Sequence, residues 1–267
     1  MILKLPGRYY RLRPIDAPGY ETEPVELELE KTALISLHCW DIGCEGGPAI
    51  DVNYAVGLLF PQGLAEAERI MKEKIAPAIA AARAHGLLVA HVTNYSIAMK
   101  DPVAQEDMDP MPKTEINPLI PGSSTAQPVI PGWAQYIHER AHGPYLYNPP
   151  YSEMNTAKVV APQPGDPYVF QTGQLHRALR KRGIENLIYT GFAADMCVLR
   201  AGGGAEPMLE LGYRVYLVRD ATLAVEYPDT FDQRLMTLWA LRYFESHCGD
   251  TFLFEEFMAA MEQPGKA

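Results

Sequence analysis

The feature that most constrains the fold is a strand, helix and strand in series near the start of the chain. Residues 31–40 (KTALISLHCW) and 87–95 (LLVAHVTNY) are short apolar runs that favour strands. Between them, apolar residues recur every three or four positions over 64–86, which predicts a helix that ends at Gly86 and bends at Pro77. Two strands joined by a helix predict a right-handed βαβ unit, hence a parallel sheet covered on both faces.

The remaining predicted elements continue this alternation. Short apolar runs predict three further strands, at residues 166–172, 186–191 and 213–221. Helical periodicity lies between and after them, at residues 173–183, 194–211 and 229–247. Strands that alternate with helices are typical of α/β proteins. The sequence therefore predicts a three-layer α/β fold with a doubly wound parallel sheet and helices on both faces.

Three segments flank or interrupt this pattern. We predict an extended arm outside the core at residues 1–30 and a tail at 251–267, so that 31–250 form a single domain. An insertion at about 96–157 holds 10 of the chain's 23 prolines, which disfavour regular structure. Loops of this length are typically lids or partner-binding segments. Its aromatic side chains either line a small-molecule site or pack against the sheet or another subunit: Trp133, Tyr145, Tyr147 and Tyr151.

Composition and charge exclude several classes of function. A chain of 267 residues with 48% hydrophobic composition can bury a sizeable core. Its net charge of -10 disfavours a phosphate-binding surface, so we expect no nucleic-acid partner. No apolar stretch has the length of a signal-peptide core or a membrane span, which predicts a cytoplasmic protein with no membrane partner. The four cysteines are too few for a disulfide framework and are expected to be reduced.

Ligands of open parallel sheets bind beyond the carboxyl ends of the strands. This rule selects five stretches: His38–Asp41, Thr93–Tyr95, Phe170–Thr172, Thr190–Cys197 and Asp220. Among them, Cys197 follows a predicted strand and opens a predicted helix. The positive end of that helix would favour the thiolate, and its free N–H groups would bind an oxyanion. The alternative is that Cys197 is an inert cysteine in a packed core.

Residues 187–222 (LIYTGFAADMCVLRAGGGAEPMLELGYRVYLVRDAT) resemble the signature of the isochorismatase-like cysteine hydrolases, which include nicotinamidases and N-carbamoylsarcosine amidohydrolases. The matching positions are Gly191, Asp195, Cys197, Val198, Gly212, Tyr213, Val215, Asp220 and Ala221. The resemblance implies a doubly wound parallel sheet and thiolate attack on a C–N bond of a small amide or ureido compound. It also implies a cis peptide bond between Phe192 and Ala193, and an oxyanion hole formed by the N–H groups of Ala193 and Cys197.

The chain departs from the family's Asp-Lys-Cys triad at two positions. His38 stands at the position of the aspartate and Gln171 at that of the lysine. In one account, His38 is the base and Gln171 a hydrogen-bonding support. In a second, Asp41, Lys113 or Lys158 restores the missing charge from another point on the backbone. In a third, hydrolysis has been lost and the protein binds a small molecule or a protein partner.

The resemblance leads to further expectations about ligands and assembly. Asn94 and Tyr95, at a strand end, are candidate binding residues, and Arg200 either receives a substrate carboxylate or is solvated. We expect no metal and no cofactor, because the second strand lacks the family's Asp-x-His pattern. His91 is expected inside that strand, Cys39 on the face opposite His38, and Cys44 and Cys248 in structural positions. Proteins that the chain resembles are usually dimers or tetramers, so a homo-oligomer is expected.

Overall fold

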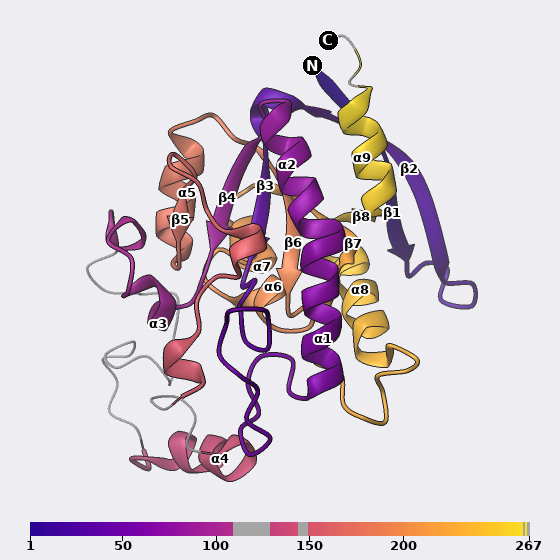
Figure 1. The fold of residues 1–267 in the computed structure, drawn as a ribbon. Helices are drawn as coiled ribbons and strands as arrows, with labels where there is room; N and C mark the ends of the chain where they lie inside the picture. The colour runs from indigo at the N-terminus through magenta and orange to yellow at the C-terminus, as the bar shows by residue number, and fades with distance from the viewer. Residues whose placement is uncertain (109–128, 144–148, 264, 266–267) are drawn as a thin grey trace.

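The computed structural model describes residues 1–108, 129–143, 149–263 and 265. Within these residues, eight strands form one sheet in the order β2-β1-β8-β7-β6-β3-β4-β5 (Figure 1). The strands are β1 (Ile2–Arg11), β2 (Gly19–Glu28), β3 (Thr32–Leu37), β4 (Leu88–Val92), β5 (Tyr168–Val169), β6 (Asn186–Phe192), β7 (Arg214–Leu223) and β8 (Asp250–Phe252). The helices are α1 (Pro61–Ile70), α2 (Ala76–Ala84), α3 (Tyr95–Ala98), α4 (Trp133–His142), α5 (Thr172–Arg180), α6 (Cys197–Arg200), α7 (Ala205–Glu210), α8 (Leu235–His247) and α9 (Phe254–Glu262).

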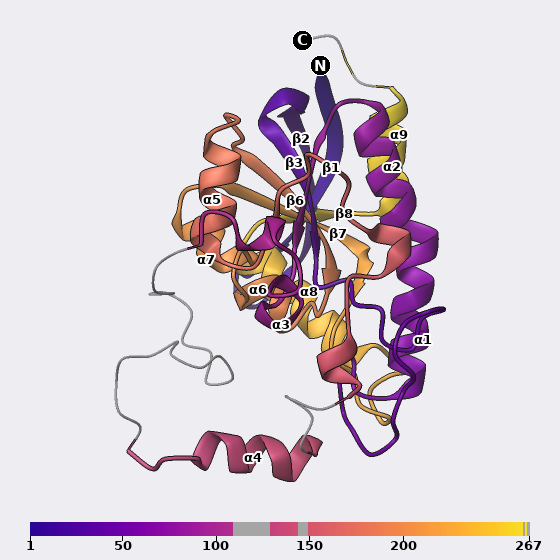
Figure 2. The ribbon, with the colours of Figure 1, turned by 60° about the vertical axis from the view of Figure 1, so that its left-hand side comes forward.

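The predicted three-layer α/β fold is confirmed. Neighbouring strands from β5 to β8 along the sheet are parallel, and at one edge β1 pairs antiparallel with both β8 and β2. Helices α1, α2 and α9 cover one face, and α5, α6, α7 and α8 cover the other (Figure 2). The described helices include none that is long and apolar enough to cross a membrane.

Strand β3 shows why the first apolar run is continuous. All six of its residues are buried, because both faces of the strand are covered. Leu34 packs into the core beneath α1 and α2, whereas Ile35 and Leu37 pack into the core beneath α5 and α8. Cys39 continues into the first of these cores, as predicted.

The two ends of the chain differ from the expectation of an arm and a tail. Residues 1–30 contribute the hairpin β1–β2 to the sheet, and Leu3, Leu5 and Leu27 are buried in the core beneath α9. Residues 251–267 include α9, whose Phe257 is fully buried in the same core. Only alternate residues at the start of β1 are buried, because one face of the hairpin is solvated, and the sequence shows no continuous apolar run there.

The predicted helix at 64–86 is continuous but not regular. Between α1 and α2, residues Met71–Ile75 form one turn of π-helix, in which the Ala76 N–H donates to the Met71 carbonyl. Pro77 follows directly and has no N–H to donate to the Glu73 carbonyl. The π-helical turn therefore accommodates Pro77, where the sequence predicted a bend of the helix.

The predicted helix at 194–211 is wrong, because the structure divides it into α6 and α7. The intervening chain holds three successive glycines, residues 202–204, which weaken a helix. Gly203 has φ +76, its carbonyl accepts a hydrogen bond from Tyr189 Oη at 2.8 Å, and its N–H donates to Thr172 Oγ1 at 3.0 Å. These bonds hold the loop between β6 and α5.

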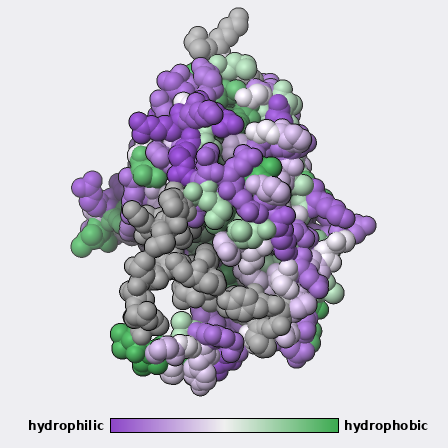
Figure 3. Space-filling view, turned by 90° about the vertical axis from the view of Figure 1, so that its left-hand side faces the viewer, coloured by the Kyte–Doolittle hydropathy of each residue, from purple (hydrophilic) through white to green (hydrophobic). Residues whose placement is uncertain are grey.

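Figure 3 shows that the outer face of the molecule on the α5 side is mainly hydrophilic in its upper part.

Asp166, in the loop before β5, ties β4 and α2 together. Its carboxylate accepts a hydrogen bond from the Gln163 N–H at 2.9 Å, lies 3.3 Å from Nε2 of the buried His91 and forms an ion pair with Arg83. Burial alone would raise the pKa of Asp166. The interactions with His91, the Gln163 backbone and Arg83 outweigh burial and lower that pKa to about 2.

We expect Asp166→Asn to destabilise the protein by on the order of 2 kcal/mol at pH 7. The pKa of Asp166 in the folded protein lies below the value of about 3.9 of an unfolded chain. The ionised carboxylate therefore stabilises the fold fully above about pH 5, and this contribution disappears as the pH falls toward 2. Urea denaturation at pH 7, 5 and 3 measures the effect, with the exposed Asp229→Asn as the control. A difference from the parent that does not shrink at low pH would contradict it.

Candidate active site

Three strands end side by side at the edge of the sheet selected by the sequence. Leu37 of β3 pairs with Val92 of β4 and with Gly191 of β6. The next residues in the sequence are His38, Thr93 and Phe192, respectively. They therefore lie at the same edge of the sheet. Gly191 has φ +108, and a Cβ atom there would stand 1.9 Å from the Leu37 carbonyl oxygen. Only glycine permits this close approach of β3 and β6.

Cys197 is the first residue of α6 and lies beyond the end of β6. The peptide bond between Phe192 and Ala193 is cis, which confirms the expectation from the resemblance. The Ala193 carbonyl accepts hydrogen bonds from the N–H groups of Met196 and Val198. Among the described residues, no protein oxygen accepts a hydrogen bond from the N–H of Ala193 or of Cys197. The Ala193 N–H is in hydrogen-bond contact with the Cys197 sulfur, and both N–H groups lie beside the candidate nucleophile.

The surroundings of Cys197 differ from those expected for a favoured thiolate. Burial raises the pKa of the Cys197 thiol to about 11, and Asp195 nearby adds to the increase, while a hydrogen bond with the Ala193 backbone only partly opposes it. Helix α6 has four residues and so a small dipole. The thiol is therefore protonated at neutral pH, although part of the residue's surface is exposed.

His38 follows β3 in a left-handed conformation, with φ 50. Its ring stacks on that of Trp40, with 5.0 Å between the ring centres. Burial lowers the pKa of His38 to about 4, and the nearby Thr93 backbone opposes this only in part. That contact with the Thr93 backbone is weak, and neither ring nitrogen makes a well-formed hydrogen bond in the described part of the chain. His38 is thus a neutral imidazole at pH 7 and is not hydrogen-bonded to Cys197.

Two of the predicted site residues cap helices. Gln171 is the N-cap of α5, where its side chain accepts the N–H of Gln174, and the Gln174 side chain accepts the Gln171 N–H at 3.2 Å. Asn94 caps α3 by accepting the Ile97 N–H at 2.9 Å. Its amide nitrogen also donates to Tyr151 Oη at 3.2 Å, so this side chain connects the end of β4 to the insertion. Polar side chains at strand ends therefore serve the helices that follow.

A carboxylate and an ammonium group meet near this edge. Asp41 is buried and accepts the Asn155 N–H at 2.8 Å. Burial raises the pKa of Asp41, whereas the Asn155 hydrogen bond and the charges of Lys100 and Lys158 lower it. Lys100 donates to the Met154 carbonyl at 2.7 Å, and burial lowers its pKa. The sequence reading missed Lys100, which belongs to no motif and comes near Asp41 only through the path of the loop after α3.

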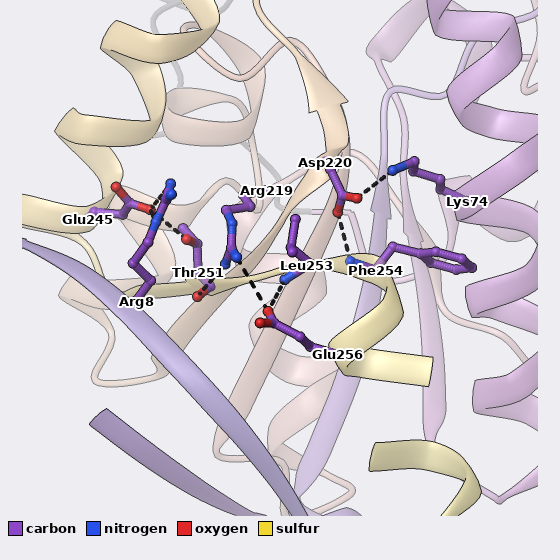
Figure 4. Close-up of polar contacts among 9 residues, drawn as sticks. All are labelled: Arg8, Lys74, Arg219, Asp220, Glu245, Thr251, Leu253, Phe254 and Glu256. Atoms are coloured by element: carbon purple, nitrogen blue, oxygen red, sulfur yellow. Dashed lines mark hydrogen bonds and ion pairs between the residues drawn. The ribbon is translucent and has the colours of Figure 1, made fainter. Parts of the chain in front are cut away.

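Three other predicted residues lie in different surroundings. Arg200 is exposed and pairs with Glu206 at 3.2 Å. This agrees with the second of its two predicted roles, a solvated surface residue. Asp220 accepts the Phe254 N–H at 2.7 Å and pairs with Lys74, so it anchors the start of α9 (Figure 4). The ring of Tyr95 packs edge-on against Phe170, 5.8 Å away.

The aromatic residues of the insertion do not form one wall. Trp133 stacks on Tyr136 along α4, and both side chains are about half exposed. Tyr151 packs edge-on against Trp40, with 6.4 Å between the ring centres. Tyr145, Tyr147 and Lys113 lie outside the described residues. Within the described ranges, no group of three or more metal-binding side chains comes together.

Comparison with known proteins agrees with this architecture. The family model of the isochorismatase domain matches residues 157–238. A cysteine hydrolase from Pseudomonas syringae pv. phaseolicola 1448A is 18% identical, with a TM-score of 0.57 over 88% of this chain and 94% of that one. An isochorismatase family protein from Burkholderia thailandensis is 21% identical, with a TM-score of 0.51 over 89% and 98%. A search of curated protein sequences gave no match.

At these identities the two solved structures establish the fold alone, which is that of an α/β protein with an isochorismatase-like sheet. The domain match covers the segment that holds Cys197. The fold and this partial domain match both agree with the resemblance that the sequence indicated.

Proposed function

We propose that the protein is a cysteine-dependent hydrolase that cleaves the C–N bond of a small amide or ureido compound. The observation that supports this most directly is the placement of Cys197. Its thiol lies beyond the carboxyl end of β6, in contact with the Ala193 backbone, and no protein oxygen in the described residues accepts the N–H of Ala193 or of Cys197. A nucleophile next to two backbone N–H groups that no protein oxygen occupies is the arrangement that acyl transfer requires.

The proposed reaction has two stages. His38 accepts the thiol proton as the thiolate adds to the carbonyl carbon, and the two N–H groups bind the oxyanion. The C–N bond then breaks, and the amine leaves with the proton that His38 held. In the second stage, water adds to the thioester and releases the acid, which restores the thiol. Gln171 supports this edge by capping α5.

The test is ammonia release from a panel of primary amides and ureides. We expect Cys197→Ser to lower kcat by on the order of 10³-fold or more, because it removes the nucleophile. Cys248→Ser is the matched control, since Cys248 is also partly exposed and burial also raises its pKa to about 11. Equal turnover by parent and Cys197→Ser would refute the proposal.

The pH dependence tests the role of His38 separately. A base must be neutral to accept a proton, so kcat/KM should fall as the pH drops through about 4, the pKa of His38. His38→Asn keeps a residue that tolerates a left-handed backbone and removes the imidazole. This variant should slow turnover and abolish the fall of kcat/KM at low pH. If kcat/KM of His38→Asn falls at low pH as it does in the parent, the base is another group, such as Asp41.

One observation favours a second candidate, a non-hydrolytic protein that binds a small molecule. The Cys197 thiol has a raised pKa, and no hydrogen bond links it to His38. A resting site of this kind binds a ligand without reaction unless binding itself promotes proton transfer. Saturable binding of amides by the parent without ammonia release would establish this candidate.

A further inference from the structure

Four polar atoms are buried without a well-formed hydrogen bond where β3 and β4 end. They are both ring nitrogens of His38, Trp40 Nε1 and Thr93 Oγ1, and none makes a well-formed hydrogen bond within the described residues. The His38 ring has only a weak contact with the Thr93 backbone, and the Thr93 hydroxyl only a weak one with Tyr168. His38 is 8% exposed and Thr93 is 1% exposed. We refer to these three residues as the His38–Trp40–Thr93 cluster.

The cluster is contiguous. The His38 N–H donates to the Val92 carbonyl at 2.9 Å, which places His38 next to Thr93 across the two strands. The imidazole stacks on the Trp40 ring at 25° to its plane. On the outer side, Trp40 packs against Tyr151, and Asn94 fixes Tyr151 through its hydroxyl. The unpartnered atoms thus belong to one polar region with aromatic walls.

The cluster is unusual even within this edge of the sheet. Thr190 and Thr222 are equally buried, yet their hydroxyls donate to the carbonyls of Ile35 at 3.0 Å and Gly191 at 2.6 Å. A buried polar atom without a partner costs about 1–3 kcal/mol, and native proteins leave few of them. Among the residues that the structure describes, the indole N–H of Trp40 has no partner, and the hydroxyl of Thr93 has only a weak one, so a bound group can supply the missing bonds.

We infer that the His38–Trp40–Thr93 cluster is a subsite for the uncharged amide or ureido group of a ligand, and that Trp40 and Thr93 set its specificity against carboxylates. The indole N–H donates to the ligand carbonyl and the Thr93 hydroxyl accepts a ligand N–H, while the single acceptor nitrogen of neutral His38 is left for the Cys197 proton. This inference rests on the proposed function for the substrate class, and it names the residues that recognise that class.

The charges around the cluster explain the discrimination. Trp40 and Thr93 carry no charge, and His38 is neutral at pH 7. Asp41, which follows Trp40 in the sequence, accepts the Asn155 N–H, and Lys100 donates to the Met154 carbonyl. A carboxylate would lose its hydration here without gaining a counter-charge, whereas an amide exchanges hydrogen bonds with water for hydrogen bonds with protein.

Binding to the Cys197→Ser protein separates recognition from turnover. We expect it to bind benzamide at least tenfold more tightly than benzoate. Trp40→Phe keeps an aromatic ring without the N–H, and Thr93→Val keeps the shape without the hydroxyl. Each should weaken benzamide binding by about five- to tenfold and leave benzoate unchanged. Trp239→Phe, at an exposed tryptophan of α8, is the control and should bind as the parent does.

A measurement without changes in the cluster supports the same test. In the ¹⁵N-labelled Cys197→Ser protein, benzamide should shift the indole N–H resonance of Trp40 and leave those of Trp133 and Trp239 in place. Benzamide binding that neither Trp40→Phe nor Thr93→Val weakens, together with an unshifted Trp40 resonance, would overturn the subsite. Binding that depends on both residues, with no turnover by the parent, would retain the subsite and refute the hydrolase. If the enzyme turns over amides and KM is unchanged in Trp40→Phe and Thr93→Val, the hydrolase is retained and the subsite is refuted.

Discussion

Gly191→Ala should destabilise the protein by more than about 3 kcal/mol, and it should disrupt the candidate active site as well. An added Cβ would lie 1.9 Å from the Leu37 carbonyl oxygen, and φ +108 is a backbone conformation that alanine rarely adopts. Relief of the clash requires β3 and β6 to separate. His38 and the segment from Phe192 to Cys197 follow those strands, so both would move.

Gly212→Ala is the matched control for this change. Gly212 also has a positive φ, +91, but a Cβ there would meet nothing within 4 Å. We therefore expect only the cost of the backbone conformation, roughly 1 kcal/mol. Urea denaturation of both variants measures the two costs. Similar losses in both would mean that β3 tolerates the extra methyl group and that Gly191 serves only its own conformation.

Arg8→Met should be the second large change, with an expected loss of about 3–5 kcal/mol. Arg8 lies on β1 and forms two contacts with Glu245 of α8, from Nε at 2.8 Å and from Nη2 at 2.7 Å (Figure 4). The side chain of Glu245 is fully buried and accepts one further hydrogen bond, from Thr251 Oγ1 at 2.5 Å. Without Arg8, a buried carboxylate would remain without its counter-charge.

Lys4→Met on the same strand is the control, because Lys4 pairs with Glu26 at 3.3 Å and both side chains are more than half exposed. Such a pair contributes less than about 1 kcal/mol. The double variant Arg8→Met with Glu245→Gln should recover part of the loss, since it also removes the buried charge. If Arg8→Met and Lys4→Met lower the denaturation midpoint equally, then Glu245 does not depend on Arg8.

The parts of the fold that the sequence predicted are those with strong local patterns. Residues 32–37 are apolar without interruption, and such a run predicts a strand covered on both faces. The break between α6 and α7 also had a local signal, the three glycines at 202–204, which the helical periodicity of 194–211 obscured. The hairpin β1–β2 had a weaker signal, because its place at the sheet depends on distant partners such as Glu245.

For the candidate site, the sequence predicted where residues lie in the fold better than it predicted their pKa values. The motif located Cys197 and the cis bond before Ala193. The raised pKa of the thiol could not be predicted, since it results from burial by residues that are distant in the sequence. Trp40 and Thr93 carry no motif, and only the pairing of β3 with β4 brings them together.

The order of the strands also determines how the sheet ends. At one edge, β5 has only two residues, which offer another chain few backbone groups to pair with. At the other edge, β2 is ten residues long, but it contains Pro24 and carries the carboxylates of Glu21, Glu23, Glu26 and Glu28. A β-strand of a second molecule that approached this edge would meet like charges and a missing N–H donor. Both edges therefore resist the edge-to-edge pairing that leads to aggregation.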